Sequence, residues 1–174
     1  MIARKATHGE VPPLIDNDST VLLLGSMLSP KSAAAKFYYA HPQNRFWKVL
    51  AAVFDSDEVP CGNDARAAFA LENRVALWDV ISACDILGAS DSTIKNVRYN
   101  DISGLLAAHP NVTRVFTTGK KAHELLMKYN ATAHNAIISS AVCLPSTSPQ
   151  NCAVSLESLI QSYGIIKTGI TERR

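Results

Sequence analysis

Three short apolar runs, each ending in a polar or glycine turn, limit the fold more than any other feature of this sequence. They are "TVLLLGS" at residues 20–26, "RVALWDV" at 74–80 and "VTRVFTTG" at 112–119. Runs of this length with turn residues at their ends are typical of strands buried on both faces of a parallel sheet. A fourth strand is predicted within "AIISSAVCLPSTSP", residues 136–149, which leads into a Ser/Pro-rich loop.

Helical patterns separate these runs. Helices are predicted to begin near Asn44, over 65–73, over 101–110 where Pro110 stops the helix, over 120–130, and over 151–164 with Gly164 as the cap. Residues 1–18 are expected to be a polar lead-in. Alternating strands and helices predict an α/β protein with a parallel-type sheet. With 174 residues and no repeat or linker, we expect a single domain over 1–174.

Composition sets few limits on function. A formal net charge of +2 neither requires nor excludes nucleic-acid binding. The opening "MIARKATHGEVPPLI" lacks the apolar segment of a signal peptide, and no run is long enough to span a membrane, so we expect a cytoplasmic protein. The four cysteines, Cys61, Cys84, Cys143 and Cys152, form no C-x-x-C pair. They are interpreted as ordinary thiols, and no metal site is expected.

The loops after the predicted strands are the expected functional region, because ligands of parallel sheets bind outside the carboxyl ends of the strands. These loops are "GSMLSP", "WDVISACD", "TGKKAH" and "LPSTSP". Gly25–Ser26 and Thr118–Gly119 could let backbone N–H groups approach an anion. Neither matches a glycine-rich nucleotide fingerprint, so each can equally be a simple turn.

The segment "FYYAHPQNRFWKVL", residues 37–50, concentrates aromatic side chains around His41 and Asn44. A core would favour aliphatic side chains at such positions, and an ordinary surface would carry fewer aromatic rings. The pattern indicates a place where a flat molecule is stacked and held.

Together these segments resemble the uracil-DNA glycosylase superfamily over about residues 18–165. "AHPQNRFWKV" is similar to mismatch-specific uracil-DNA glycosylases. A fuller set of four segments resembles the hypoxanthine-DNA (DNA-deoxyinosine) glycosylase branch more closely: "LLLGSMLSPKSAAAKFYYAHPQNRFWKVL", "VALWDVISACDILGASDSTIKNVRYNDI", "VFTTGKKAHELL" and "LPSTSPQN". The resemblance implies a three-layer α/β/α sandwich with a central four-stranded, mostly parallel sheet. It implies hydrolysis of the N-glycosidic bond of a damaged base in DNA, without a metal or organic cofactor.

The resemblance also implies site residues. A base flipped out of the duplex is stacked on an aromatic ring, which points to Tyr38, Tyr39 or Phe46, with His41 and Met27 also expected to contact the base. Asn44 is the predicted catalytic residue, and the backbone at Gly25 and Ser26 is predicted to hold a base oxygen. An amide does not ionise near neutral pH, so Asn44 is expected to position water and stabilise the transition state.

Three positions depart from the superfamily pattern. Met27 stands where many members carry an Asp or Asn, and Leu144 stands where uracil enzymes carry a His. Asp79 stands where uracil-specific relatives tend to carry an Asn. An ionised carboxylate only accepts hydrogen bonds, which suits the N1–H of hypoxanthine. The equally open alternative is that Asp79 caps backbone amides of the loop 82–90.

Contacts with the DNA backbone are predicted for two loops. Lys120 is expected to contact a phosphate, although a solvated lysine is the common alternative. The second loop, "LPSTSPQN", could equally be a turn that caps the last helix. Asn100 is interpreted as a cap of the helix from Ile102. The full predicted set is Gly119, Lys120, Pro145, Ser146, Thr147 and Ser148.

The sequence therefore predicts a monomeric, monofunctional glycosylase of base excision repair that acts on DNA containing a deaminated base, releases hypoxanthine and leaves an abasic site. Monofunctional chemistry is predicted because no lysine of the pocket loops clearly stands where a Schiff base would form. Three alternatives stay open: a uracil or G:U mismatch glycosylase, a non-catalytic binder of damaged or single-stranded DNA, and an enzyme of free nucleosides.

Overall fold

A four-stranded parallel sheet forms the centre of the protein. The computed structural model describes residues 4–9, 11–87 and 93–171. The sheet order is β3–β2–β6–β7, and every neighbouring pair is parallel. The strands are β2 (Val21–Gly25), β3 (Val75–Asp79), β6 (Arg114–Thr118) and β7 (Val142–Leu144). This arrangement confirms the predicted four-stranded sheet.

The apolar run of β2 explains why this strand occupies the interior. Its side chains alternate between the two faces, and both faces are buried. Val21 and Leu23 belong to one core cluster, while Leu22 and Leu24 belong to the other. All four are fully buried. Burial on both faces removes any need for a polar alternation, which is why the run is continuously apolar.

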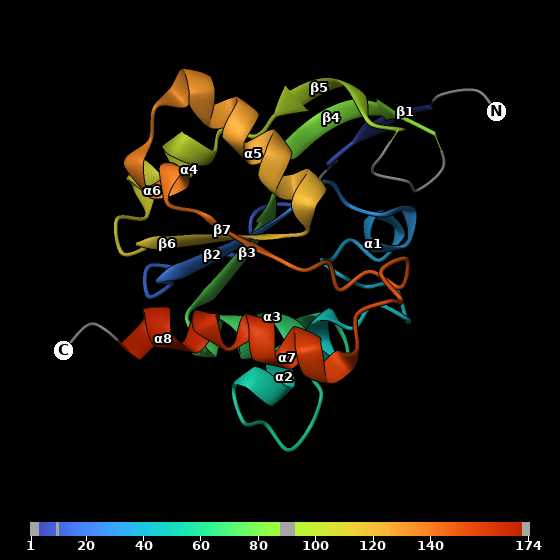
Figure 1. Cartoon of the computed structure of the whole chain (residues 1–174), viewed down its shortest axis with the longest axis vertical. Coiled ribbons are helices and arrows are strands. Elements are labelled where there is room, and N and C mark those ends of the chain that lie inside the picture. Colours follow the sequence, from blue (N-terminus) through green and yellow to red (C-terminus); the bar gives the residue numbers. More distant parts are fainter. Residues whose placement is uncertain (1–3, 10, 88–92, 172–174) are drawn as a thin grey trace.

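Helices cover both faces of this sheet and complete the three layers (Figure 1). On one face lie α4 (Ile102–Ala108), α5 (Lys120–Ala133) and α6 (Ala136–Ser139). On the other lie α2 (Phe46–Val53), α3 (Asn63–Glu72), α7 (Leu156–Tyr163) and α8 (Ile165–Thr171). The short helix α1 (Pro30–Ala34) lies in the loop that follows β2. The predicted α/β/α sandwich is thus confirmed.

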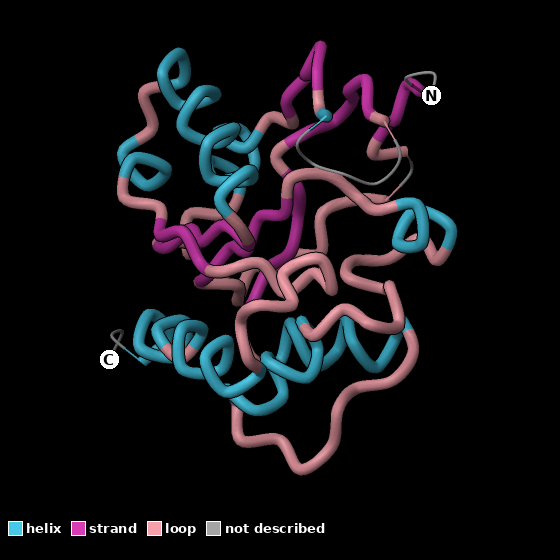
Figure 2. Tube along the Cα trace, turned by 45° about the vertical axis from the view of Figure 1, so that its right-hand side comes forward, coloured by secondary structure: helices cyan, strands magenta, loops and turns pink. Residues whose placement is uncertain are grey.

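A second, antiparallel sheet was not predicted. It consists of β1 (Arg4–Thr7), β4 (Ile81–Ile86) and β5 (Lys95–Tyr99) in the order β1–β4–β5, and it lies apart from the central sheet in Figure 2. The interpretation of residues 1–18 as a lead-in without structure is therefore wrong for β1. The segment expected to be the loop 82–90 is largely strand β4, and residues 88–92 fall outside the described part of the chain. Only one residue separates β3 from β4, so the two sheets meet at Asp79.

Two local predictions need correction. The fourth strand has only three residues, because residues 136–139 form the helix α6. The cap of α4 is Asp101, whose side chain accepts from the N–H of Gly104, and not Asn100. Gly164 is the C-cap of α7, as predicted, with a right-handed backbone that is followed by α8. The helix predicted near Asn44 begins at Phe46.

Candidate active site

A cleft of about 610 Å³ opens where the carboxyl ends of the parallel strands meet. Gly25 ends β2, Asp79 ends β3, Thr118 ends β6, and Pro145 follows β7. Most of the residues predicted from the sequence come together here. Those in the lining are Gly25, Ser26, Met27, Tyr38, Tyr39, Asn44, Asp79, Lys120, Pro145, Ser146, Thr147 and Ser148.

Asn44 presents a fixed amide to this cleft. Its Oδ1 accepts hydrogen bonds from the backbone N–H of Phe46 at 2.9 Å and from the hydroxyl of Thr147 at 2.8 Å. The N–H of Phe46 can only donate, so the orientation of the amide is defined. Within the described residues, no partner is found for Nδ2 of Asn44. The polar group that Asn44 offers to a ligand is therefore a hydrogen-bond donor.

The loop over residues 145–154 is held rigidly around Asn44. The Arg45 guanidinium donates to the carbonyls of Val154, Asn151 (2.8 Å) and Ser148 (3.4 Å). The backbone N–H of Arg45 donates to the carbonyl of Thr147. Consecutive residues 44 and 45 thus bind the same loop from two sides. Thr147 lines the cleft but is only 1% exposed, and its hydroxyl is bound to Asn44, which leaves it little surface for the predicted contact with DNA.

Two aromatic rings form a stacked pair beside the cleft. Tyr39 and Phe46 lie 3.8 Å apart between ring centroids with an interplanar angle of 12°. Phe46 is fully buried and does not line the cleft, so it supports Tyr39 instead of contacting a base directly as predicted. Tyr38 is 2% exposed and donates to the carbonyl of Pro12, which identifies it as mainly a core residue. Tyr39 is therefore the ring available for stacking.

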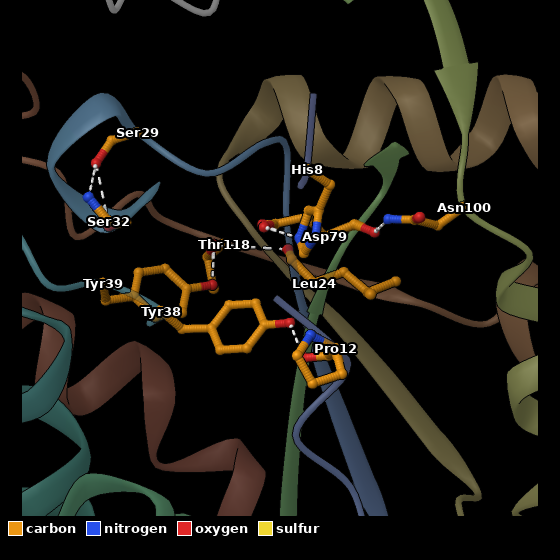
Figure 3. Close-up of polar contacts among 10 residues, drawn as sticks. All are labelled: His8, Pro12, Leu24, Ser29, Ser32, Tyr38, Tyr39, Asp79, Asn100 and Thr118. Carbon is orange, nitrogen blue, oxygen red and sulfur yellow. Dashed lines mark hydrogen bonds and ion pairs between the residues drawn. The ribbon is translucent and has the colours of Figure 1, made fainter. Parts of the chain in front are cut away.

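The hydroxyl of Tyr39 is held at the end of the sheet (Figure 3). It lies 2.9 Å from Oγ1 of Thr118, which in turn donates to the carbonyl of Leu24. Burial raises the pKa of Tyr39 well above its usual range, and the nearby Asp79 carboxylate raises it further. Tyr39 therefore remains un-ionised over the whole physiological range, with its hydroxyl hydrogen directed toward Thr118.

Asp79 is held by two residues, His8 and Asn100, as Figure 3 shows. Its Oδ2 lies 2.8 Å from Nε2 of His8, and its backbone carbonyl accepts from the side-chain amide of Asn100 at 2.8 Å. The residue is 4% exposed, and none of its hydrogen bonds goes to the amides of the following loop in the described structure. This arrangement differs from the alternative in which Asp79 capped that loop.

The turn after β2 is fixed through its carbonyl groups. Those of Gly25 and Ser26 accept from the backbone N–H groups of Val80 and Ile81 at 2.9 and 3.0 Å. A Cβ atom on Gly25 would lie 2.3 Å from Oδ1 of Asp79. Glycine is thus required here by the close approach of the carboxylate, a reason that the sequence pattern did not reveal.

The two loops that were predicted to contact phosphates lie side by side. A Cβ on Gly119, whose φ is +117°, would lie 3.3 Å from Cβ of Ser146. The N–H of Gly119 donates to the carbonyl of Leu144 at 2.8 Å. Gly119 itself does not line the cleft, whereas the exposed Lys120 and the neighbouring Ser146 do. Leu144 is buried in the core, at 3% exposure, where uracil enzymes were expected to carry a His.

His41 lies away from the cleft lining. Its Nδ1 accepts from the N–H of Gln43 at 3.1 Å, so the ring stabilises the turn before Asn44. Sequence reasoning missed His8, Arg45 and Thr118, which hold cleft residues in place. Their partners are 71, 106 and 79 residues away in sequence, so no local pattern could identify them.

Neither a metal-binding cluster nor a membrane-spanning helix is present among the described residues. No group of three or more His, Cys, Asp or Glu side chains is arranged to hold a metal ion there. Among the helices of the same residues, none has both the length and the apolar character needed to cross a bilayer.

Comparison with known proteins identifies the family. The model of the uracil DNA glycosylase superfamily matches residues 12–161. The chain belongs to the uracil DNA glycosylase superfamily. This finding confirms the predicted superfamily and its enzyme class of DNA glycosylase. The matched span contains every residue of the cleft except Ala6.

Three relatives place the chain within this superfamily. It is 34% identical over 113 residues to the hypoxanthine DNA glycosylase of Methanosarcina barkeri, and 31% identical over 113 residues to that of Methanosarcina acetivorans. Each alignment covers 65% of this chain and 72% of the relative. A solution NMR structure from Methanosarcina acetivorans, provisionally named a uracil DNA glycosylase, superposes with a TM-score of 0.76 at 26% identity. That match covers 91% of this chain and 95% of the other.

Proposed function

We propose that this protein is a monofunctional DNA glycosylase that hydrolyses the N-glycosidic bond of deoxyinosine, releases hypoxanthine and leaves an abasic site. The observation that carries the proposal is the cleft itself, in which the oriented amide of Asn44 lies with the ring of Tyr39 and the carboxylate of Asp79. The names of the two curated relatives support hypoxanthine as the base.

The cleft suits a base that has left the duplex. The reactive bond of a stacked base is inaccessible, so glycosylases extrude the nucleotide into a pocket and stack the base on an aromatic ring. Tyr39 has Phe46 on one face, which leaves its edge and other face for a ligand. Phe46 also prevents the Tyr39 ring from rotating away. Stacking on such a ring contributes about 1–3 kcal/mol per base.

Asn44 acts on the charge that develops during cleavage. As the bond from C1′ to the base breaks, its electron pair moves onto the base, and the sugar becomes oxocarbenium-like. An N–H donor directed at a base oxygen stabilises the negative charge that develops on the leaving base. Water then adds to C1′ and gives up a proton to solvent or to the base. The amide of Asn44 requires no ionisation for this role, which agrees with its engaged oxygen.

Asp79 supplies recognition of the base. Hypoxanthine carries a hydrogen on N1, whereas adenine has a lone pair there. With Oδ2 bound by His8, Oδ1 of Asp79 is the oxygen left to accept from N1–H. A carboxylate would repel the lone pair on N1 of adenine. Adenine also lacks the N1–H donor, so it would leave the carboxylate oxygen unpaired in a polar site, which is strongly unfavourable. Undamaged adenine is therefore rejected.

Lys120 is proposed to contact the DNA backbone. It is the lysine among the cleft-lining residues, it is exposed, and it follows Gly119 at the first position of α5. This position at the rim favours a phosphate contact over attack on C1′. Reduction with borohydride during turnover distinguishes the two roles, because it traps a Schiff base as a covalent protein–DNA adduct. We expect no adduct.

The test of the function is base release from a labelled duplex that contains one deoxyinosine, followed by alkaline treatment that cuts at abasic sites. Wild-type protein should produce alkali-dependent scission and free hypoxanthine. Asn44→Ala should reduce the rate by about 100-fold or more, the usual cost of losing one transition-state donor. Binding without scission would favour a non-catalytic binder, and release of hypoxanthine from free inosine would favour an enzyme of nucleosides.

A further inference from the structure

We propose that His8 is a positioning residue that holds the Asp79 carboxylate as an acceptor for the ring N–H that deamination creates. This inference rests on the proposed function and extends it to the residue that follows β1. His8 lies outside residues 12–161, the span matched by the family model. The proposal therefore adds a residue of the N-terminal segment to those that recognise the base.

The contact between the two residues is short and buried. Nε2 of His8 lies 2.8 Å from Oδ2 of Asp79, and the two side chains are 6% and 5% exposed. An ionised carboxylate can only accept, so Nε2 carries the hydrogen of this pair. Hydrogen bonds to charged groups are among the strongest, and a low local dielectric increases their strength. The pair therefore fixes the rotation of the carboxylate.

The second sheet holds His8 in this position. Thr7 pairs with Ala83 of β4, and the N–H of His8 donates to the carbonyl of Ser82 at 2.7 Å. The ring of Tyr38 lies 6.1 Å from the imidazole ring. Because β4 begins one residue after Val80, the backbone that positions His8 is nearly continuous with the strand that ends at Asp79.

One carboxylate oxygen remains for a ligand. Oδ1 of Asp79 lies against Cα of Gly25, at a place where any side chain would collide with it. Asn100 fixes the backbone carbonyl of Asp79, and His8 fixes Oδ2. Both the main chain and the side chain are thus immobilised, and Asp79 lines the cleft. This is the arrangement expected of a group that recognises a ligand by geometry.

The chemistry of deamination identifies what this oxygen recognises. Deamination converts N1 of adenine, and likewise N3 of cytosine, from an acceptor into an N–H donor. A fixed carboxylate accepts from the deaminated base and repels the undamaged one. The His8–Asp79 pair therefore selects deaminated bases as a class. It does not by itself separate hypoxanthine from uracil, since both present a ring N–H.

The experiment compares single-turnover base release by four proteins: wild type, His8→Leu, His8→Gln and His8→Asn. Two duplexes are used, one with deoxyinosine and one with deoxynebularine, whose purine base has no ring N–H. We expect His8→Leu and His8→Asn to lower the rate on deoxyinosine by about 10- to 100-fold. Gln can place an N–H donor close to the position of Nε2, whereas Asn is too short, so His8→Gln should stay within about 5-fold of wild type.

Two further readouts separate positioning from a purely structural role. The preference for deoxyinosine over deoxynebularine should fall in His8→Leu by the same factor as in Asp79→Asn. In the Asp79→Asn background, His8→Leu should have no further effect beyond about twofold, because interacting residues show non-additive effects. Thermal unfolding shows whether each variant is folded. If His8→Leu does not fold, His8→Asn takes its place in both comparisons.

The outcomes are distinct. If the wild type releases hypoxanthine but the substrate preference is unchanged in His8→Leu and His8→Asn, the inference fails while the proposed function stands. Equal losses on both duplexes, or additive losses with Asp79→Asn, would likewise overturn it. If the wild type releases no base, the proposed function fails and the role of His8 fails with it.

Discussion

The hydroxyl of Thr147 donates a 2.8 Å hydrogen bond to the amide oxygen of Asn44, from 103 residues along the chain. This contact and the N–H of Phe46 occupy both lone-pair directions of that oxygen. They leave the NH₂ group as the part of Asn44 that is available to a ligand. The loop that contains Thr147 therefore determines which end of the amide is presented.

A pair of substitutions at Thr147 tests this role. Thr147→Val removes the hydroxyl and keeps the shape, which allows the Asn44 amide to rotate. We expect the single-turnover rate on deoxyinosine to fall by about 10-fold, the equivalent of one hydrogen bond of roughly 1.4 kcal/mol. Thr147→Ser retains the hydroxyl and should stay within about threefold of wild type. Equal rates for the two variants would show that the hydroxyl does not matter.

Asn44→Asp distinguishes a donor from an acceptor at this position. The Asp side chain can still accept from Phe46 and Thr147, but its remaining oxygen would be an acceptor facing the ligand. If Asn44 acts through its NH₂ group, Asn44→Asp should be as slow as Asn44→Ala, about 100-fold or more below wild type. If the residue instead withdraws a proton from water, a carboxylate should equal or exceed the amide. Rates measured above pH 6, where the new carboxyl is ionised, decide between these outcomes.

Much of the architecture could be predicted, because it depends on local patterns. The apolar runs that gave β2, β3 and β6 are buried on both faces, and this property is visible in sequence. The short strands β1, β4 and β5 lack such a signal. β5 is largely exposed, and β1 has four residues with no apolar run. Their pairing is a long-range event that local periodicity cannot indicate.

The candidate site was predictable only in part, for a related reason. Gly25, Tyr39, Asn44 and Asp79 stand at strand ends or in the aromatic segment, and they do line the cleft. Their supporting partners are distant in sequence and are of common residue types. Phe46 was expected to contact the base, and the sequence could not show that it stacks on Tyr39 outside the cleft lining.

Lys120 should determine part of the salt dependence of DNA binding. A lysine that neutralises one phosphate releases about one counterion, so the slope of log K against log salt should decrease by about 1 in Lys120→Gln. Lys128 offers a matched control, since it pairs with Glu124 on the exposed side of α5 and lies outside the cleft lining. Lys128→Gln should leave the slope unchanged. An unchanged slope in Lys120→Gln as well would contradict the phosphate contact.

Two buried tyrosines and the partly buried Tyr39 should show abnormal alkaline titration. Burial raises the pKa of Tyr38, Tyr39 and Tyr163 well above the usual value near 10. A raised pKa in the folded state means that these groups stabilise the fold fully below about pH 10, and that the stabilisation is lost as the pH rises further. Absorbance near 295 nm should report their ionisation only together with unfolding. Gradual ionisation of all five tyrosines near pH 10 in the folded protein would contradict this.

Gly25→Ala should impair the site without disrupting the core. The new Cβ would lie 2.3 Å from Oδ1 of Asp79, so the carboxylate must move from the position set by His8. We expect a loss of at least about 10-fold in base release, with the unfolding temperature lowered by only a few degrees. The Asp79→Ala background removes the colliding atom, and there the same change should cost little. Additive losses in the double variant would show that the two residues act independently.

Release of hypoxanthine from DNA in this cleft is best tested by the single-turnover rate on two duplexes that differ only in carrying deoxyinosine or deoxyuridine, with Asn44→Ala measured beside the wild type. We expect faster release at deoxyinosine, and loss of that release in Asn44→Ala. Release mainly at deoxyuridine would contradict the assignment and identify a uracil enzyme instead.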